Sequence, residues 1–304
     1  MPRPLSRCRA LSVDLHESLH GTASTVRRWV LIEEPGPWGP DALRDNRLDP
    51  ELMSRIREMV RPLRLRVVLI RRVHRRRGAS PERRRCLLAW TGSKGGWVEE
   101  AVLDAPEQVL ELDLEALSHG RSPGLRKVAH PLYLVCTHGS HDPCCAEQGR
   151  PVARALADGL PQQTWEVSHI GGDRFAANIL VLPQGLYYGR VPPEAAVSLA
   201  RTHERGEVEV RYLRGRTAYD FGVQAAECLL RRRTGIRGID DLPLRSARRE
   251  GDETEAVFTA PQGGRYRVRV RTTADSIDRA LTCHARRPSA PPEHELVEWH
   301  LETA

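Results

Sequence analysis

Residues 131–173 form the stretch that decides the fold, and they read PLYLVCTHGSHDPCCAEQGRPVARALADGLPQQTWEVSHIGGD. An apolar run of strand character ends at Cys136, and apolar side chains then recur at helical spacing over residues 145–160. A second short strand is predicted over residues 164–167, and it runs into His169. The pattern therefore predicts a strand, a helix and a strand, with cysteine and histidine at the turns between them.

This order of elements occurs twice along the chain. The predicted strands and helices of the first half are residues 26–33, 50–60, 65–71, 86–91 and 97–103, and those of the second half are 133–136, 145–160, 164–167, 179–182, 186–190 and 193–202. Strand, helix, strand and hairpin in succession are typical of a thioredoxin-like sheet with helices on its faces. We predict an α/β fold of tandem thioredoxin-like domains, each a mixed sheet flanked by helices, with a small C-terminal antiparallel β region.

The predicted domain boundaries follow the change in pattern. Residues 1–125 form a degenerate first domain without ligands of its own, residues 126–242 a second domain that carries the cysteine and histidine motif, and residues 243–304 a small β-rich region. The last region alternates apolar with polar residues, which is typical of half-buried strands. Cys283 lies in this region at irregular spacing from the nearby histidines, and we predict surface or core roles for these residues.

The motif gathers thiol, imidazole and carboxylate groups, which are the ligands of metal and iron-sulfur sites. Cys144 and Cys145 open the predicted helix, where free N–H groups and the helix dipole favour the thiolate form. His169 and Asp173 are separated by three residues that include a Gly-Gly pair, so both side chains can face one centre. The residues leave open whether the thiols bind metal or act as nucleophiles.

The motifs resemble a known family. The phrases Cys-Thr-His-Gly-x-x-Asp-x-x-Cys from Cys136 and Ser-His-x-Gly-Gly-x-x-x-Ala-x-Asn from Ser168, with Leu-Pro-x-Gly-Leu-Tyr-Tyr-Gly-Arg at residues 182–190, are similar to the sucrase/ferredoxin-like family of thioredoxin-like ferredoxins. The resemblance implies a 2Fe-2S cluster held by two cysteines and two histidines. By position, Cys136, Cys145 and His169 are three of its ligands, and residues 126–242 form the ferredoxin domain.

This chain departs from the family pattern at the second histidine. The family motif His-x-Gly-Gly-His reads His-Ile-Gly-Gly-Asp here, so Asp173 stands at the position of the fourth ligand. A carboxylate is a harder ligand than imidazole but one that iron accepts, and its charge favours the oxidised cluster. Alternatively, Asp173 pairs with an arginine and the fourth ligand is His138, His141 or Cys144. A third alternative is that the cluster is lost and the fold is kept.

Three functions fit these residues. The first is single-electron transfer by a 2Fe-2S protein, a non-enzymatic carrier or a component of a redox system. The second is thiol-disulfide redox chemistry by Cys136 and Cys145, although the thioredoxin Cys-x-x-Cys spacing is absent. The third is structural zinc bound by the same side chains, because zinc accepts the same donors. No pair of carboxylates in a supporting context predicts sucrose hydrolysis.

The charge balance suggests the kind of partner. The chain has 47 basic and 40 acidic residues, and the densest basic run lies at residues 71–77. A solvated rim is one interpretation of this run, and a docking patch for an acidic redox partner is the other, because complementary charge speeds encounter. Nucleic acid is not expected as a partner, since no reader motif accompanies the arginines and aromatic residues make up only 5% of the chain.

The start of the chain and its cysteines indicate the compartment. The first eight residues contain no apolar run of a signal peptide, and no segment reaches the length of a membrane span. Seven scattered cysteines do not form a disulfide framework, and Cys86 and Cys228 fall in apolar patterns typical of inert core thiols. We therefore expect a cytoplasmic protein without a membrane partner.

Overall fold

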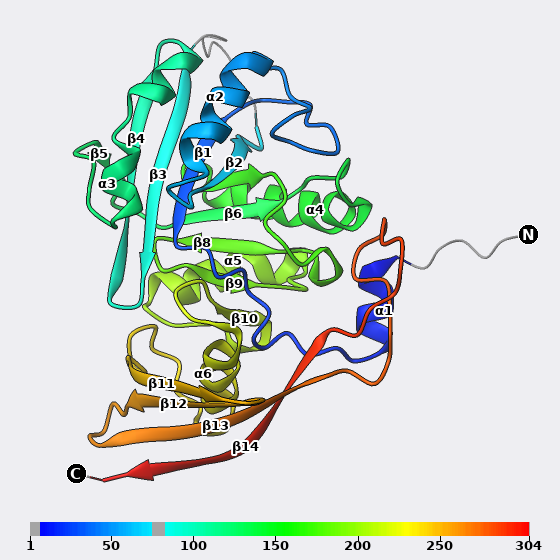
Figure 1. The fold of residues 1–304 in the computed structure, drawn as a ribbon, viewed down its shortest axis with the longest axis vertical. Helices are drawn as coiled ribbons and strands as arrows, with labels where there is room; N and C mark the ends of the chain where they lie inside the picture. Colours follow the sequence, from blue (N-terminus) through cyan, green and yellow to red (C-terminus); the bar gives the residue numbers. More distant parts are fainter. Residues whose placement is uncertain (1–6, 75–82, 304) are drawn as a thin grey trace, which may run out of the picture.

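A computed structural model describes residues 7–74 and 83–303, and two similar units form most of it (Figure 1). The first unit consists of β1 (Arg28–Glu33), α2 (Pro50–Val60), β2 (Arg66–Arg71), β3 (Arg84–Gly92) and β4 (Gly95–Leu103). The second consists of β6 (Leu132–Cys136), α4 (Pro143–Gly159), β7 (Thr164–Val167), β8 (Ile179–Leu182) and β9 (Leu186–Tyr188). In each unit the first two strands pair in parallel and the hairpin that follows is antiparallel.

The two units have the same strand order, which is β2-β1-β3-β4 in the first and β7-β6-β8-β9 in the second. They join where β2 and β7 pair antiparallel, with Ile70 opposite Val167 and Arg71 opposite Glu166. The result within the described residues is one continuous ten-stranded sheet, in the order β10-β9-β8-β6-β7-β2-β1-β3-β4-β5. The predicted α/β fold with thioredoxin-like strand order is confirmed, and its two sheets are fused edge to edge.

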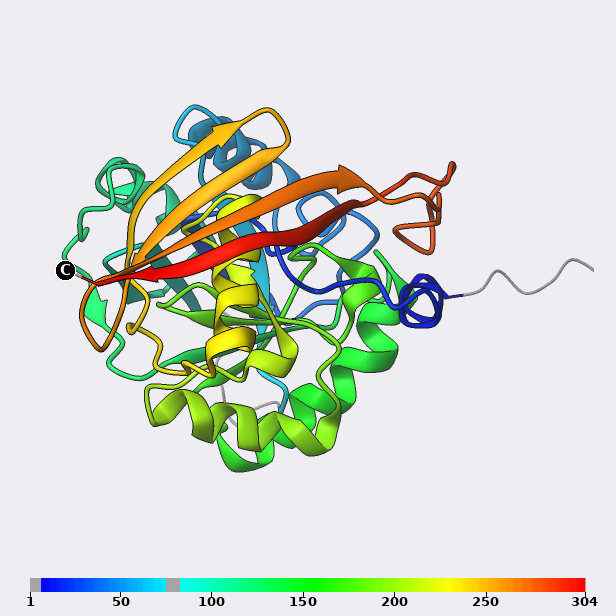
Figure 2. The same cartoon turned by 90° about the horizontal axis from the view of Figure 1, so that it is seen from below.

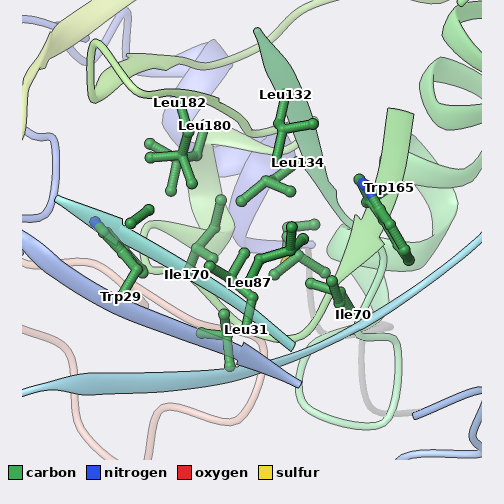
Figure 3. Close-up of a cluster of buried hydrophobic side chains, with 14 of the residues drawn as sticks. Trp29, Leu31, Ile70, Leu87, Leu132, Leu134, Trp165, Ile170, Leu180 and Leu182 are labelled. Carbon is green, nitrogen blue, oxygen red and sulfur yellow. The ribbon is translucent and has the colours of Figure 1, made fainter. Parts of the chain in front are cut away.

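A shared hydrophobic core holds the two units together (Figure 3). Trp29 and Leu31 of the first unit belong to the same buried cluster as Leu134, Trp165 and Leu180 of the second. Each large apolar side chain that is fully removed from water contributes about 1.5–3 kcal/mol. The join between β2 and β7 therefore lies in a packed interior, and it fixes the second unit's strand ends relative to the first unit.

The C-terminal region packs on the sheet through one helix (Figure 2). Helix α6 (Phe221–Thr234) ends at Gly235, whose positive φ of 74° forms its left-handed cap. A four-stranded antiparallel sheet covers α6 and consists of β11 (Leu244–Glu250), β12 (Glu253–Thr259), β13 (Arg265–Ala274) and β14 (Pro292–Glu302). Apolar side chains of α6, β12 and β13 share one buried cluster, so this β region is part of the molecule's interior packing.

Several elements were not expected from the sequence. Helix α1 (Cys8–Asp14) is too short for a periodic pattern. The pattern of residues 208–213 favours a strand, but this prediction is wrong: residues 210–212 form a turn, η3 (Val210–Tyr212), and strand β10 (Leu213–Arg216) begins only at residue 213. The remaining elements are η1 (Pro106–Glu111), α3 (Leu114–Ser118), β5 (Arg126–Lys127), η2 (Asp173–Phe175) and α5 (Pro193–Glu204). Helix α3 exists because the Asp113 carboxylate accepts the N–H of Ala116 and caps it.

Only part of the basic run at residues 71–77 can be placed, because residues 75–77 lie outside the described residues. Arg71 forms an ion pair with Glu166, and its guanidinium lies 4.3 Å from the ring centre of Trp38. Arg72 lies 3.5 Å from the ring centre of Trp165. Both arginines therefore contact the protein itself, and docking of an acidic partner on this run stays a prediction. Across residues 7–74 and 83–303, no helix has the length and apolar character that crossing a membrane requires.

His203 at the end of α5 predicts a loss of stability in acid. Burial, together with the positive charge of Arg216, lowers the pKa of His203 to about 4. The unfolded chain binds this proton at about pH 6.5, so stability is complete above that pH and falls as the pH drops toward 4. The parent should lose free energy of unfolding between about pH 7 and pH 5, and His203→Gln should reduce that loss by about 2 kcal/mol, as measured by urea unfolding. Exposed His74→Gln is the control, and equal pH slopes for the two variants would contradict the assignment.

Candidate metal centre

The two candidate thiols lie at the end of a strand and the start of a helix. Cys136 is the last residue of β6, and Cys145 lies in the first turn of α4. The helix begins there because the Asp142 carboxylate accepts the N–H of Cys144 at 2.9 Å and Pro143 occupies the first helical position. Both thiols are buried, so the chain encloses two soft sulfur ligands away from water.

A glycine allows this helix to approach the strand. Gly149 faces the backbone of Cys136, and a Cβ atom added at Gly149 would lie 2.0 Å from the Cys136 carbonyl oxygen. No side chain larger than hydrogen fits at that distance. The separation between β6 and α4, and with it the separation between Cys136 and Cys145, therefore depends on Gly149.

The second half of the centre is the tight turn between β7 and η2. Gly171 and Gly172 adopt positive φ angles of 101° and 80°, which favour glycine and bring Asp173 back toward His169. The turn carbonyls are held by buried donors: Asn178 Nδ2 donates to Gly172 O at 2.8 Å. Tyr187 Oη donates likewise to Ile170 O at 3.0 Å. These hydrogen bonds to the side chains of Asn178 and Tyr187 fix the course of the turn.

Arg214 supports the same turn and was missed by the sequence reasoning. Its buried guanidinium donates to Gly171 O at 3.1 Å and to Asn178 Oδ1 at 2.8 Å. Burial lowers the pKa of Arg214 to about 10, an effect that Tyr187 opposes. Arg214 lies on β10, far along the chain, so no local motif points to it. One indirect signal was present in the sequence: the buried carbonyls of a Gly-Gly turn need hydrogen-bond donors, which indicates that a polar side chain from elsewhere in the chain lies beside the turn.

The candidate donor atoms converge. The sulfurs of Cys136 and Cys145 and a ring nitrogen of His169 all lie within 4.8 Å of one another. Cys145 Sγ donates to Asp173 Oδ1 at 3.1 Å, and His169 Nδ1 lies 2.9 Å from the same oxygen. Although it is buried, His169 Nδ1 makes no hydrogen bond of normal geometry with any group in the described part of the chain. The four predicted residues are therefore neighbours, and the His169 imidazole lies beside both the thiols and the Asp173 carboxylate.

Of the two other nearby histidines, only His141 can contribute to this group. His138 Nε2 donates to Gly39 O at 2.7 Å, and its Nδ1 accepts the N–H of His169 at 3.2 Å, so both of its ring nitrogens are engaged. The ring of His141 lies 3.9 Å from that of His169, and His141 Nε2 lies 3.8 Å from Asp173 Oδ2. His138 therefore positions the backbone of His169, while His141 is a second imidazole at the centre.

The remaining alternatives lead away from this centre. Cys144 Sγ lies 3.7 Å from Cys8 Sγ and 3.5 Å from Cys283 Sγ, in a separate group. Arg174, the arginine next to Asp173 in the chain, forms its ion pair with Glu17 at 2.7 Å. The geometry thus leaves Asp173 facing Cys145 and His169.

The side chains at the centre shift one another's pKa values. The pKa of Cys136 is lowered by the neighbouring Cys145 thiol, an effect that burial opposes and His169 reinforces. Burial alone would raise the pKa of Asp173, but the adjacent His169 and the Cys145 thiol bring it below its usual value. Burial disfavours the charged form of His169, yet the Asp173 carboxylate outweighs this and raises the pKa. The centre thus favours a thiolate and a carboxylate around one imidazole.

Comparison with known proteins places most of the chain in one family. The family model described as sucrase/ferredoxin-like matches residues 19–215, which is well over half of the chain and includes the whole candidate centre. The resemblance of the motifs is therefore confirmed.

Relatives and solved structures match smaller parts. Altered inheritance of mitochondria protein 32 from Meyerozyma guilliermondii is 30% identical over 94 residues, which are 28% of this chain and 33% of that protein. The chain thus matches about a third of the length of this relative. Two cysteine-to-serine variants of the thioredoxin-like 2Fe-2S ferredoxin from Aquifex aeolicus each cover 28% of this chain and 97% of their own. They are 22% identical, with TM-scores of 0.25 and 0.24.

Proposed function

The chain belongs to the sucrase/ferredoxin-like family, and we propose that it binds a 2Fe-2S cluster and transfers single electrons. The observation that carries this proposal is the convergence of two buried thiols with His169 and Asp173. Thiolates with nitrogen or oxygen ligands suit iron in such clusters. When bound, the cluster would supply one-electron oxidation and reduction.

The residues of this chain divide the centre into a deep and an outer side. Cys136 and Cys145 are fully buried, whereas the side chains of His169 and His141 are 24% and 35% exposed. Cys136 and Cys145 would supply the thiolate ligands, His169 the imidazole ligand and the buried Asp173 the carboxylate. The imidazole edges then reach the surface, where an electron donor or acceptor can approach. The buried side excludes water from the sulfurs and helps set the potential.

Asp173 would make this centre more negative than the family pattern. Two thiolates, one carboxylate and one imidazole carry one more negative charge than two thiolates with two imidazoles. Extra negative charge stabilises the oxidised state and lowers the reduction potential. The proposal therefore includes a direction for the potential relative to a His-His version of the same site.

The composition of the purified protein tests the proposal. The protein is reconstituted with iron and sulfide without oxygen, and iron, sulfide and zinc are measured beside the visible and electron paramagnetic resonance spectra. A 2Fe-2S protein contains about two irons and two sulfides per chain, is brown and gives a resonance signal on one-electron reduction. A colourless protein with zinc that depends on Cys136 would favour the structural zinc site. A colourless, metal-free protein whose Cys136 and Cys145 oxidise reversibly would favour thiol-disulfide chemistry.

Substitution of Asp173 tests the fourth ligand. If its carboxylate binds iron, Asp173→His should keep the cluster and raise its potential, because a neutral ligand replaces an anionic one. Asp173→Ala should make the cluster labile, which iron retention after gel filtration measures. The matched variant is His141→Ala, which removes the neighbouring imidazole and should leave the iron content unchanged. The opposite result, with full iron in Asp173→Ala and loss in His141→Ala, would transfer the fourth ligand to His141.

A further inference from the structure

A second group of thiols lies beside the first centre and is built from three distant parts of the chain. Cys8 comes from α1, Cys144 from the first turn of α4, and Cys283 from the loop between β13 and β14. Figure 1 shows α1 lying next to that loop. The distances between the sulfur atoms are 3.7 Å for Cys8 and Cys144, 3.5 Å for Cys144 and Cys283, and 3.6 Å for Cys283 and Cys8.

These distances fit a single metal ion. Zinc binds thiolate sulfur at about 2.3 Å, so two sulfurs of a zinc tetrahedron lie about 3.8 Å apart. The three sulfurs thus form a nearly regular triangle. Its edges are slightly shorter than the sulfur–sulfur distance expected around zinc. An iron-sulfur cluster would not hold three cysteine sulfurs this close to one another, because each of its irons is bound by at most two cysteines.

A buried carboxylate completes the group. Asp142 Oδ2 lies 3.6 Å from Cys8 Sγ, and the Asp142 side chain belongs to the same set of potential ligands. Cys144 N donates to Asp142 Oδ1 at 2.9 Å, and Cys283 N donates to Asp142 Oδ2 at 2.7 Å. Such outer hydrogen bonds orient a metal-binding carboxylate and leave each oxygen a second lone pair.

We propose that Cys8, Cys144, Cys283 and Asp142 bind one structural zinc ion. Zinc is favoured because it accepts three thiolates and one further donor in a closed tetrahedral site. A disulfide explains the group less well, since any pair would leave the third thiol without a partner. This site is separate from the 2Fe-2S proposal: Cys144 and Cys145 are consecutive, yet they face different groups.

The zinc ion would fasten α1 and the loop between β13 and β14 to the helix that carries the first centre. Within the described part, α1 is also attached by Arg9, whose Nε donates to Ala176 O at 2.7 Å, and by the ion pair between Arg7 and Glu147 of α4. Loss of zinc should therefore free α1 and the loop at residue 283 before the main sheet unfolds.

Zinc content of the full chain tests this site. The parent should retain one equivalent of zinc after desalting, and Cys283→Ser, at the least buried of the three cysteines, should lose it. His284→Asn changes the next, exposed residue and is the matched control. Cys136→Ala should keep its zinc while losing iron, which separates a failure of this proposal from a failure of the cluster. A parent without zinc, or zinc that is lost in Cys136→Ala and kept in Cys283→Ser, would overturn the assignment.

Cobalt provides a second measurement that needs no substitution among the proposed zinc ligands. Metal-free Cys136→Ala, which lacks the cluster and its colour, is titrated with Co²⁺ without oxygen. Three thiolates should give an intense thiolate-to-cobalt charge-transfer band and the visible bands of tetrahedral cobalt, and one equivalent of Zn²⁺ should abolish them. Absence of the charge-transfer band, or a disulfide between two of the three cysteines found by mass spectrometry of the reductant-free protein, would refute the site.

Discussion

Replacing Cys136 or Cys145 with alanine is expected to abolish bound iron and sulfide. In the proposed cluster site these two thiols are the soft ligands, and both are buried. Histidine and aspartate alone do not retain sulfide-bridged ferric iron, so the expected loss is complete. Iron and sulfide analysis after anaerobic reconstitution measures it, and circular dichroism verifies that each variant is folded.

Three other cysteines serve as controls for this result. Cys86→Ala and Cys228→Ala remove buried thiols far from any candidate ligand group, and they should keep full iron and sulfide. Cys144→Ala is the sharper control, because it is adjacent to Cys145 and should keep the iron while losing the zinc. Full iron in Cys145→Ala with loss in Cys144→Ala would reverse the roles of these two neighbours.

Gly149→Ala is expected to have the second largest effect. The added methyl group would meet the Cys136 carbonyl oxygen at 2.0 Å, and the atom it meets is backbone in the centre of a sheet. Relief requires α4 to move away from β6, which costs about 3 kcal/mol, the upper part of the range for overpacked cores. Urea unfolding measures the loss of stability. The same movement separates Cys136 from Cys145, so iron retention should fall as well.

The same helix supplies the control for Gly149. Gly159 ends α4, and a Cβ atom there would meet no atom closer than Val197 Cγ2, at 4.0 Å. Gly159→Ala should therefore be neutral or add about 0.5–1 kcal/mol, the usual gain of alanine over glycine in a helix. If the two variants had equal stability and equal iron content, the close approach at Gly149 would not be what sets the position of the helix.

The sequence alone was sufficient for the features that depend on local pattern. Apolar periodicity predicted the strand that ends at Cys136, the helix that follows it and the strand before His169, and it did so because each signal lies within one element. The Gly171-Gly172 pair predicted a tight turn because a left-handed backbone favours glycine. Repetition of the element order predicted two thioredoxin-like units, and the strand pairing confirms this order.

Only the tertiary structure decided which side chains meet. Consecutive helical residues differ in direction by about 100°, so Cys144 and Cys145 face different groups although both open the same helix. His138 is engaged by Gly39, a residue of the first unit, which no pattern around the motif could reveal. Cys8 and Cys283 meet only because α1 and the loop between β13 and β14 pack on the same end of α4. Such contacts join residues far apart in the chain, and their geometry is set by the packing of whole elements.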